Sequence, residues 1–129
     1  MHTTNAGINH IEFWVSDLKR SLKFYEPIFA AIGWRKVNEG EFSAGSCVIY
    51  FAEKPVPKMD TVGPRHICFQ ATSRAVVDAV ARIVTNGSSS AVIRGPLEMP
   101  QYSKDYYTID FRDPDEYVIE VAHTPNMVL

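Results

Sequence analysis

Apolar and polar residues alternate in two related stretches of the chain, residues 8–15 and 65–70. Both contain the sequence His-Ile-X-Phe, which begins at His10 in the first stretch and at His66 in the second. Strict alternation predicts half-buried β-strands, in which side chains two positions apart lie on the same face. Each histidine therefore belongs to the more polar face of its strand. The residues predicted on these two faces are His10, Glu12 and Trp14, and His66, Cys68 and Gln70.

The first strand is followed by an apolar stripe with helical spacing. Steps of three and four residues between the members of the stripe indicate one buried helix face. Ser16 is predicted as the N-cap and Gly33 as the left-handed residue that ends the helix. Pro27 predicts a kink or a local break inside it. The stripe consists of Leu18, Leu22, Tyr25, Phe29 and Ile32.

The second half repeats this order. Thr72 and Ser73 are predicted to cap a second helix, which ends at Asn86-Gly87, and residues 95–105 are predicted to be irregular. A shared order of strand, helix and three strands indicates an internal duplication. The predicted organisation is a single domain, 1–129, with module 1 at 7–53, a proline-containing linker at 54–62 and module 2 at 63–123. The second helix is predicted to bury Val76, Val80, Ile83 and Val84, and further strands are predicted at 34–38, 47–52, 91–93, 107–111 and 117–122.

The composition is that of an ordinary globular protein. Of 129 residues, 46% are hydrophobic and 22% are charged, and the formal net charge is −2. A slightly negative net charge does not indicate a basic surface for binding nucleic acid. No apolar run approaches the roughly 20 residues that span a bilayer. The start lacks a signal-peptide pattern, and Cys47 and Cys68 lack CxxC spacing. We therefore expect a cytoplasmic protein with reduced thiols.

The polar strand faces carry the candidate chemistry. Unpaired buried polar groups each cost about 1–3 kcal/mol, so faces this polar are either exposed to solvent or line a cavity. On one curved face, His10 and His66 offer two imidazoles, and the same face carries carboxylates. Such a set suits a divalent ion with open coordination positions, such as zinc, iron, manganese, nickel or cobalt. A solvated or hydrogen-bonded side chain is the alternative at each of these positions.

Two motifs extend this pattern to a family resemblance. The helix sequence DLKRSLKFY (17–25) and the closing sequence DPDEYVIE (113–120), together with the two histidine strands, resemble the vicinal oxygen chelate superfamily. This superfamily includes glyoxalases, extradiol dioxygenases, methylmalonyl-CoA epimerases, fosfomycin-resistance transferases and bleomycin-resistance proteins. The resemblance covers about residues 7 to 123.

The resemblance implies both a fold and a site. The fold would be α+β, with two tandem βαβββ modules forming a curled mixed sheet, or open barrel, with the helices on its outer face. His10, His66 and Glu120 would be the metal ligands. Small members usually pair as homodimers, some with sites built from both chains, so either arrangement of the modules is open here.

One residue departs from the four-ligand members. Glyoxalase I and the epimerases place a glutamate where this chain has Tyr50. A phenol, with a pKa near 10, is a poor ligand but can donate a hydrogen bond to an oxyanion. We therefore expect Tyr50 to act in catalysis rather than as a ligand. Glu12, on the same face as His10, is a candidate general base or a carboxylate that supports a ligand. A solvated or arginine-paired glutamate is the alternative.

The substrate site has four further candidates. Trp14, Tyr102 and Tyr106 could form the walls of a site for a planar ligand, and Gln70 could hold a substrate oxygen. For each of them, packing or filling of the cleft is the alternative.

Two classes of function follow from these observations. The first is a glyoxalase-like, metal-dependent enzyme whose small substrate chelates the ion through vicinal oxygens, with lyase or isomerase chemistry favoured over dioxygenase chemistry. The second is a metal-free protein that sequesters a ligand, as bleomycin-resistance proteins do. A domain that only dimerises is a third interpretation.

Overall fold

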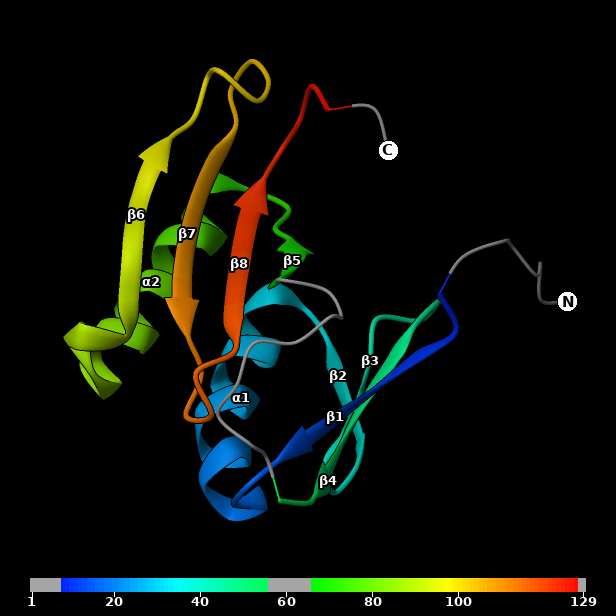
Figure 1. Cartoon of the computed structure of the whole chain (residues 1–129). Helices are drawn as coiled ribbons and strands as arrows, with labels where there is room; N and C mark the ends of the chain where they lie inside the picture. The colour runs from blue at the N-terminus through cyan, green and yellow to red at the C-terminus, as the bar shows by residue number, and fades with distance from the viewer. Residues whose placement is uncertain (1–7, 56–65, 128–129) are drawn as a thin grey trace, which may run out of the picture.

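The computed structural model describes residues 8–55 and 66–127 (Figure 1). These residues form two four-stranded mixed sheets and two α-helices, which confirms the predicted α+β fold. The first half contains β1 (His10–Val15), α1 (Leu18–Ile32), β2 (Arg35–Asn38), β3 (Glu41–Ser43) and β4 (Val48–Glu53). The second half contains β5 (His66–Gln70), α2 (Arg74–Gly87), a 3-10 turn (Ser89–Ala91), β6 (Val92–Glu98), β7 (Tyr107–Arg112) and β8 (Val118–His123).

The two sheets have the same topology. Their strand orders are β1-β4-β3-β2 and β5-β8-β7-β6, with β1 parallel to β4 and β5 parallel to β8. Even the register is repeated, because His10 pairs with Val48 and His66 pairs with Val118. The order of elements thus matches the predicted duplication. The exact module limits stay a prediction, since residue 7 and most of the linker at 54–62 lie outside the described residues.

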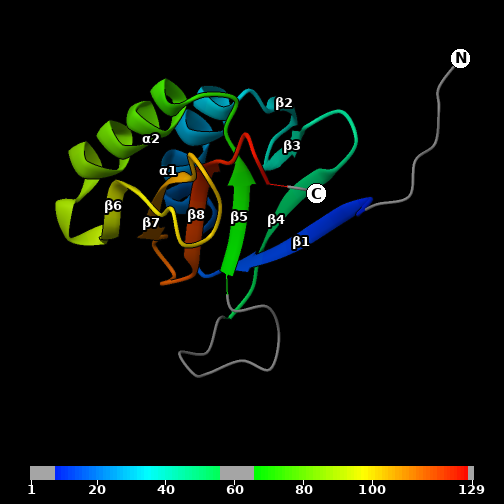
Figure 2. The same ribbon diagram turned by 90° about the horizontal axis from the view of Figure 1, so that it is seen from above.

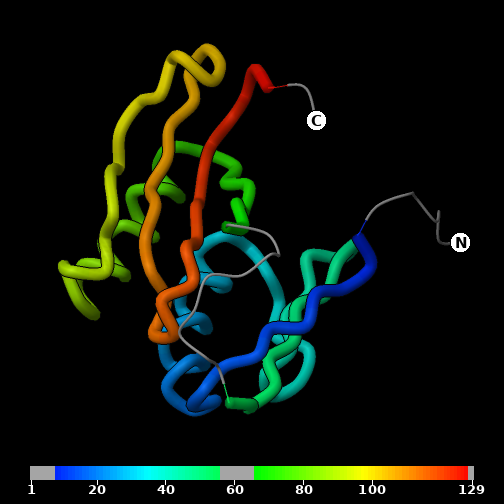
Figure 3. Tube along the Cα trace, viewed as in Figure 1, coloured from blue at the N-terminus to red at the C-terminus, as the bar shows by residue number. Residues whose placement is uncertain are grey.

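A large apolar core joins the two halves. The inward strand positions, among them Ile49 and Ile109, are fully buried together with residues of both helices. Figure 2 shows α1 and α2 side by side on one side of the sheets, and the two helices are in direct contact. The opposite faces of the sheets are therefore left for the polar residues. The tube in Figure 3 shows that the sheets diverge and do not close into a barrel; β1 and β5 are edge strands.

Helix α1 begins one residue later than predicted. Asp17, not Ser16, is the N-cap, and its carboxylate accepts a hydrogen bond from the backbone N–H of Arg20. Gly33 ends the helix with φ +92, as its position predicted. The helix continues through Pro27, so of the two predicted alternatives the local break is wrong, and the kink stays a prediction. Burial of flanking residues such as Tyr25 and Ile28 against the core offsets the missing backbone hydrogen bond.

Helix α2 begins at the predicted cap, with the Ser73 hydroxyl accepting a hydrogen bond from the backbone N–H of Val76. Its most buried face is rotated slightly from the prediction, because Val77 and Ala81 are buried while Val76 and Ile83 are only half-buried. The sequence therefore predicted the helix and its period correctly. The centre of the buried face lies about one residue from the predicted centre.

Strand β6 is longer than predicted, since it runs through Gly95 to Glu98 where an irregular stretch was expected. The register between β6 and β7 shifts around Gly95, which has φ +91. A Cβ atom at this position would lie 2.5 Å from the carbonyl oxygen of Thr108. Glycine therefore allows β6 to bend while staying paired with β7.

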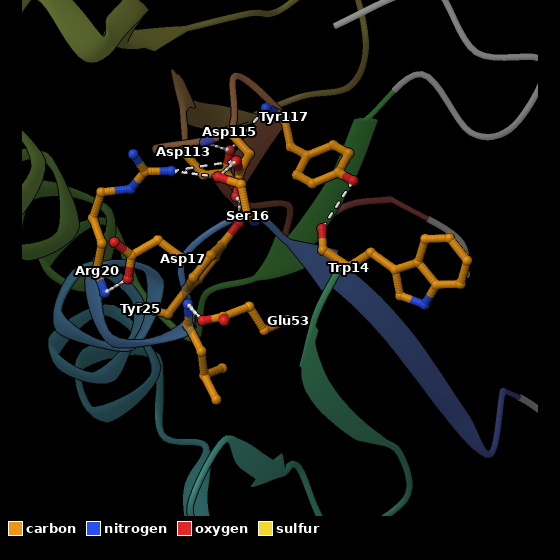
Figure 4. A network of polar contacts seen from close by, with 10 residues as sticks. Trp14, Ser16, Asp17, Arg20, Tyr25, Glu53, Asp113, Asp115 and Tyr117 are labelled. Carbon is orange, nitrogen blue, oxygen red and sulfur yellow. Dashed lines mark hydrogen bonds and ion pairs between the residues drawn. The ribbon is translucent and has the colours of Figure 1, made fainter. Parts of the chain in front are cut away.

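The turn between β7 and β8 binds the start of α1 (Figure 4). Asp115 accepts hydrogen bonds from the backbone N–H of Ser16, at 3.1 Å, and from the Ser16 hydroxyl. Arg20 forms an ion pair with Asp115 at 3.3 Å. The motif 113–120 of the second half thus holds the motif 17–25 of the first half.

A buried hydrogen bond strengthens the same junction. The Tyr25 hydroxyl, from α1, donates to Oδ2 of Asp113 at 2.7 Å, and the Tyr117 hydroxyl donates to the backbone carbonyl of Trp14 at 3.0 Å. Burial raises the pKa of Asp113 to about 6. The two halves are therefore fixed to each other by polar contacts as well as by the core.

No helix in the described part of the chain has the length and apolar character needed to cross a membrane.

Candidate functional site

The second sheet brings two of the predicted metal ligands together. Nε2 of His66, at the start of β5, lies 3.2 Å from Oε2 of Glu120 in the middle of β8. The Glu120 side chain is only 7% exposed, whereas that of His66 is 41% exposed. A nearly buried carboxylate thus faces an imidazole that solvent can reach.

The other oxygen of Glu120 is held by two hydroxyl groups. Oε1 accepts hydrogen bonds from the Tyr106 hydroxyl at 2.5 Å and from the Thr108 hydroxyl at 2.8 Å. Burial, followed by the hydrogen bond to Glu120, raises the pKa of Tyr106, so its phenol stays a proton donor. Glu120 is therefore fixed with Oε1 satisfied and Oε2 directed towards His66.

A thiol and a second carboxylate border Glu120 in the sheet. Cys68 on β5 and Asp110 on β7 are its two register partners. Burial of its sulfur raises the pKa of Cys68 to about 12, although the residue as a whole is exposed. The thiol is therefore protonated near neutral pH and is a poor nucleophile. Burial also raises the pKa of Asp110, while Nε of Arg94 donates to Oδ2 of Asp110 at 2.5 Å.

The first sheet presents a separate polar cluster. Glu12 accepts hydrogen bonds from the Tyr50 hydroxyl at 2.8 Å and from Nε1 of Trp14 at 2.5 Å. The Tyr50 hydrogen bond is the main cause of the lowered pKa of Glu12. The His10 ring lies 5.8 Å from the Tyr50 ring, centre to centre, and its Nδ1 is 2.8 Å from Oδ1 of Asn9. These contacts leave Nε2 of His10 without a hydrogen bond to any described residue.

The two polar clusters are separate within one chain. In Figures 1 and 2, the end of β1 that begins the strand points away from the second sheet. His10 is the first residue of β1. Among residues 8–55 and 66–127, no group of three His, Cys, Asp or Glu side chains could hold a metal ion. His66 and Glu120 fit an ion that accepts nitrogen and carboxylate ligands, because one nitrogen and one oxygen face the same point. The described part of the chain thus brings two of the predicted ligands, His66 and Glu120, to this point, whereas the third, His10, lies on the other sheet.

The predicted substrate residues have different surroundings. The Gln70 amide is bound within the chain, donating to the carbonyl of Ala71 at 3.0 Å and accepting from the Thr124 hydroxyl at 2.9 Å. Tyr102 is 57% exposed and packs edge-on against Tyr106. Tyr106 itself is buried beside Glu120. Trp14 is 49% exposed on the first sheet.

Four residues around Glu120 were not among the predicted site residues: its register partners Cys68 and Asp110, its hydrogen-bond donor Thr108, and Arg94, which donates to Asp110. Thr108 lies on the predicted polar face of 107–111, and alternation alone placed it beside Asp110. Arg94 was missed because the sequence predicted a strand that ended at residue 93. A surface hollow of about 840 Å³ beside α1 is lined by none of these residues, but by residues of α1 and its cap with Glu39 and Glu53.

Comparison with known proteins gives a family match over most of the chain. Residues 7–121 match the model of the Glyoxalase/Bleomycin resistance protein/Dioxygenase superfamily. A virulence protein of Salmonella typhimurium, STM3117, is 29% identical over 121 residues, covering 89% of this chain and 82% of its own length.

Solved structures share the fold. A glyoxalase/bleomycin resistance protein/dioxygenase domain from Frankia sp. superposes with a TM-score of 0.71 at 20% identity, covering 92% of this chain and 98% of its own. The fosfomycin resistance protein FosX from Mesorhizobium loti superposes with a TM-score of 0.66 at 22% identity, covering 93% of each chain. At these identities the likeness concerns the fold alone.

Proposed function

The chain belongs to the glyoxalase/bleomycin resistance protein/dioxygenase superfamily, and from that premise we propose that it is a metal-dependent enzyme. Its substrate would be a small molecule that binds a divalent ion through two neighbouring oxygens. We propose lyase or isomerase chemistry ahead of dioxygenase chemistry, because the polar faces carry hydroxyl and carboxyl groups suited to holding and moving a proton.

The arrangement of Glu120 is the observation that carries this proposal. Two hydroxyl donors occupy Oε1, and Oε2 faces Nε2 of His66 at 3.2 Å. A buried carboxylate that served only the fold would gain from satisfying both oxygens within the sheet. Here one oxygen is directed to a partly exposed imidazole, the arrangement expected of a prepared ligand pair.

We propose that the third ligand is His10 of a second copy of the chain. His10 is exposed on the polar face of the first sheet. Among the described residues, β1 pairs only with β4 and β5 only with β8, so the outer edge of each of these strands is unpaired. A two-fold homodimer would bring the first sheet of each copy to the second sheet of the other, forming two equal sites. His10, His66 and Glu120 would then hold the ion.

The remaining candidates take roles consistent with their contacts. A bound divalent ion would stabilise negative charge that develops on a substrate oxygen. Tyr50 and Glu12 form a hydrogen-bonded pair, in which we propose that Glu12 accepts a substrate proton and Tyr50 donates to an oxyanion. Trp14 and Tyr102 have the exposure needed to contact a ligand. For Gln70 and Tyr106, any contact with substrate would be additional to the bonds they already make.

Metal content tests the ligand set. Protein purified without an affinity tag is expected to retain about one divalent ion per chain, and His66→Gln and Glu120→Gln are expected to abolish retention. Glu120→Gln keeps an acceptor for Tyr106 and Thr108, so loss of the ion would not reflect loss of the fold. His123→Asn is the matched control, because Nδ1 of His123 lies against the Ala71 carbonyl on the other face.

Mixing two inactive variants tests the shared site. His10→Ala and His66→Ala each leave a homodimer without a complete site. In an equal mixture, half of the dimers combine the two variants and contain one intact site of two. The mixture should therefore recover about one quarter of the wild-type metal content. A site built within one chain would recover nothing.

A metal-free binding protein is the second candidate. It is favoured by one observation, that no group of three potential ligands forms within the described part of a single chain. The two candidates differ in their response to chelators. Removal of a bound ion by EDTA lowers the melting temperature of a metalloprotein and leaves that of a metal-free binding protein unchanged.

A further inference from the structure

A guanidinium lies on the same face of the second sheet as Glu120. Arg94 on β6 pairs with Asp110 on β7, and Asp110 pairs with Glu120 on β8. Directly paired residues project their side chains to the same face of a sheet. A row of three charged groups therefore crosses the sheet towards the edge strand that carries His66.

Arg94 is anchored on one side and open on the other. Its Nε donates to Oδ2 of Asp110 at 2.5 Å, and a hydrogen bond with Tyr102 is the main cause that raises its pKa. Nη1 lies 4.0 Å from Sδ of Met99. Even so, 37% of the side chain is exposed. These contacts fix the guanidinium plane while leaving part of it accessible to a ligand.

The contact between Asp110 and Arg94 is not explained by a gain in the stability of the fold. Asp110 is 9% exposed, and its Oδ1 is buried without a hydrogen-bond partner among the described residues. A buried acceptor without a hydrogen-bond partner destabilises the fold, and a charged one beside a second carboxylate destabilises it more. The clear effect of Asp110 is to hold Arg94 on the sheet face that carries Glu120.

A second guanidinium follows on the same face. Along β7, Thr108, Asp110 and Arg112 alternate with the core residues Ile109 and Phe111, so Arg112 shares the face of Asp110. Its register partner is Val118, which is also the partner of His66. Arg112 is exposed, and no residue in the described part of the chain forms an ion pair with it.

We propose that Arg94 and Arg112 form an anion-binding subsite beside the His66–Glu120 pair. The substrate would then carry an anionic group, a carboxylate or a phosphonate, besides the two oxygens that bind the ion. Arginine suits this task because its planar N–H groups match the oxygens of both anions. The proposal rests on the proposed metal-dependent function and specifies its substrate class.

Matched chelators test the subsite. Catechol offers two neighbouring oxygens, protocatechuate offers the same oxygens with a carboxylate, and the phosphonate analogue of protocatechuate offers them with a phosphonate. Binding of each to zinc-loaded protein is measured by calorimetry. Protocatechuate, its phosphonate analogue or both should bind at least about 10-fold more tightly than catechol, because the arginines add charge-assisted hydrogen bonds to the anion. The tighter of the two identifies the anion.

Variants assign the preference to the arginines. Arg94→Gln and Arg112→Gln should each remove most of the preference while changing catechol binding less than about twofold. Arg94→Lys should keep part of it, and Arg82→Gln, on the exposed side of α2, should keep all of it. Melting curves establish that each variant folds. Equal binding of all three chelators by the wild type would overturn the subsite, and so would an Arg94→Gln variant that weakens all three alike.

The outcomes separate the subsite from the proposed function. Catechol that fails to bind zinc-loaded protein, combined with Arg94-dependent binding of either anionic chelator, would reject the metal function and keep the subsite. If none of the three chelators binds, both proposals fail.

Discussion

Tyr50 and Glu120 occupy the same register position in the two sheets. Tyr50 on β4 pairs with Glu12 on β1, and Glu120 on β8 pairs with Cys68 on β5. Each of these two register pairs therefore contains one glutamate. In the first sheet it lies on the edge strand β1, and in the second sheet on the inner strand β8. The exposed Glu12 is held by Tyr50 and the buried Glu120 by Tyr106 and Thr108. The duplicated fold thus gives its two carboxylates different environments, which suits different roles.

Removing the Tyr50 hydroxyl should raise the pKa of Glu12. The Tyr50 hydrogen bond is the largest cause that lowers this pKa, and it favours the ionised carboxylate. In Tyr50→Phe, NMR titration of the Glu12 side-chain carboxyl carbon should show the pKa moving up towards its ordinary value. Trp14→Phe removes the smaller contribution and should move it less. An unchanged pKa in Tyr50→Phe would contradict the hydrogen bond as its cause.

Removing the Thr108 hydroxyl should weaken metal binding without unfolding the protein. Thr108→Val takes away one of two donors to Oε1 of Glu120, so the carboxylate is less firmly oriented towards His66. Loss of such supporting hydrogen bonds typically costs about 10–100-fold in metal affinity. Competition with a fluorescent chelator measures the change, and Thr85→Val, on the exposed side of α2, is the control. Equal affinities of the two variants would show that Thr108 does not prepare the ligand.

The sequence predicted the elements of this fold better than the assembly of its site. Alternation around His10 and His66 fixed which face of each strand is polar, and the repeat fixed the pairing of the last strands. Both depend on local periodicity, which is written in the sequence. The distance between His10 and His66 depends instead on how the two sheets pack. That relation is set by the core and by contacts such as Ser16 with Asp115, which no periodicity encodes.

The errors of the sequence prediction in the second half, which concern the length of β6 and the residues around Glu120, have a local physical cause. Gly95 and Pro96 predicted an end to strand structure, yet β6 passes through them by a register shift. The error removed Arg94 from the predicted sheet and hence from the candidate site. Alternation also could not tell that Thr108, Asp110 and Glu120 are buried, because burial of a polar face depends on the side chains that cover it.

Gly95→Ala should destabilise the protein strongly. An added Cβ would lie 2.5 Å from the Thr108 carbonyl, in a backbone conformation with φ +91 that alanine rarely adopts. Backbone strain of this kind costs about 1–3 kcal/mol, and the close contact adds to it. Urea unfolding measures the loss. Gly87→Ala is the matched control, because nothing lies within 4 Å of the corresponding Cβ. Equal stabilities of the two variants would refute the close approach of β6 and β7.

Asp113 should make the wild type relatively more stable in acid than a variant that lacks this carboxyl. Burial raises its pKa from 3.8 to about 6, so folding favours the protonated form. A group whose pKa is raised by folding contributes stability that is fully present below its unfolded pKa. That contribution is lost as the pH rises through the folded value, here between about pH 4 and 6. The full change corresponds to about 3 kcal/mol.

Asp113→Asn isolates this contribution. Asparagine keeps an oxygen for the backbone N–H groups of Asp115 and Tyr117, which Oδ1 of Asp113 accepts at 2.9 and 2.8 Å. It has no proton to gain or lose in this range. The free energy of unfolding of the wild type minus that of the variant should therefore fall by up to about 3 kcal/mol between pH 4 and pH 7. Urea unfolding at several pH values measures the difference, with Asp105→Asn at an exposed position as control. A constant difference across this range would mean that the Tyr25 and backbone hydrogen bonds to Asp113 outweigh the cost of burying its charge.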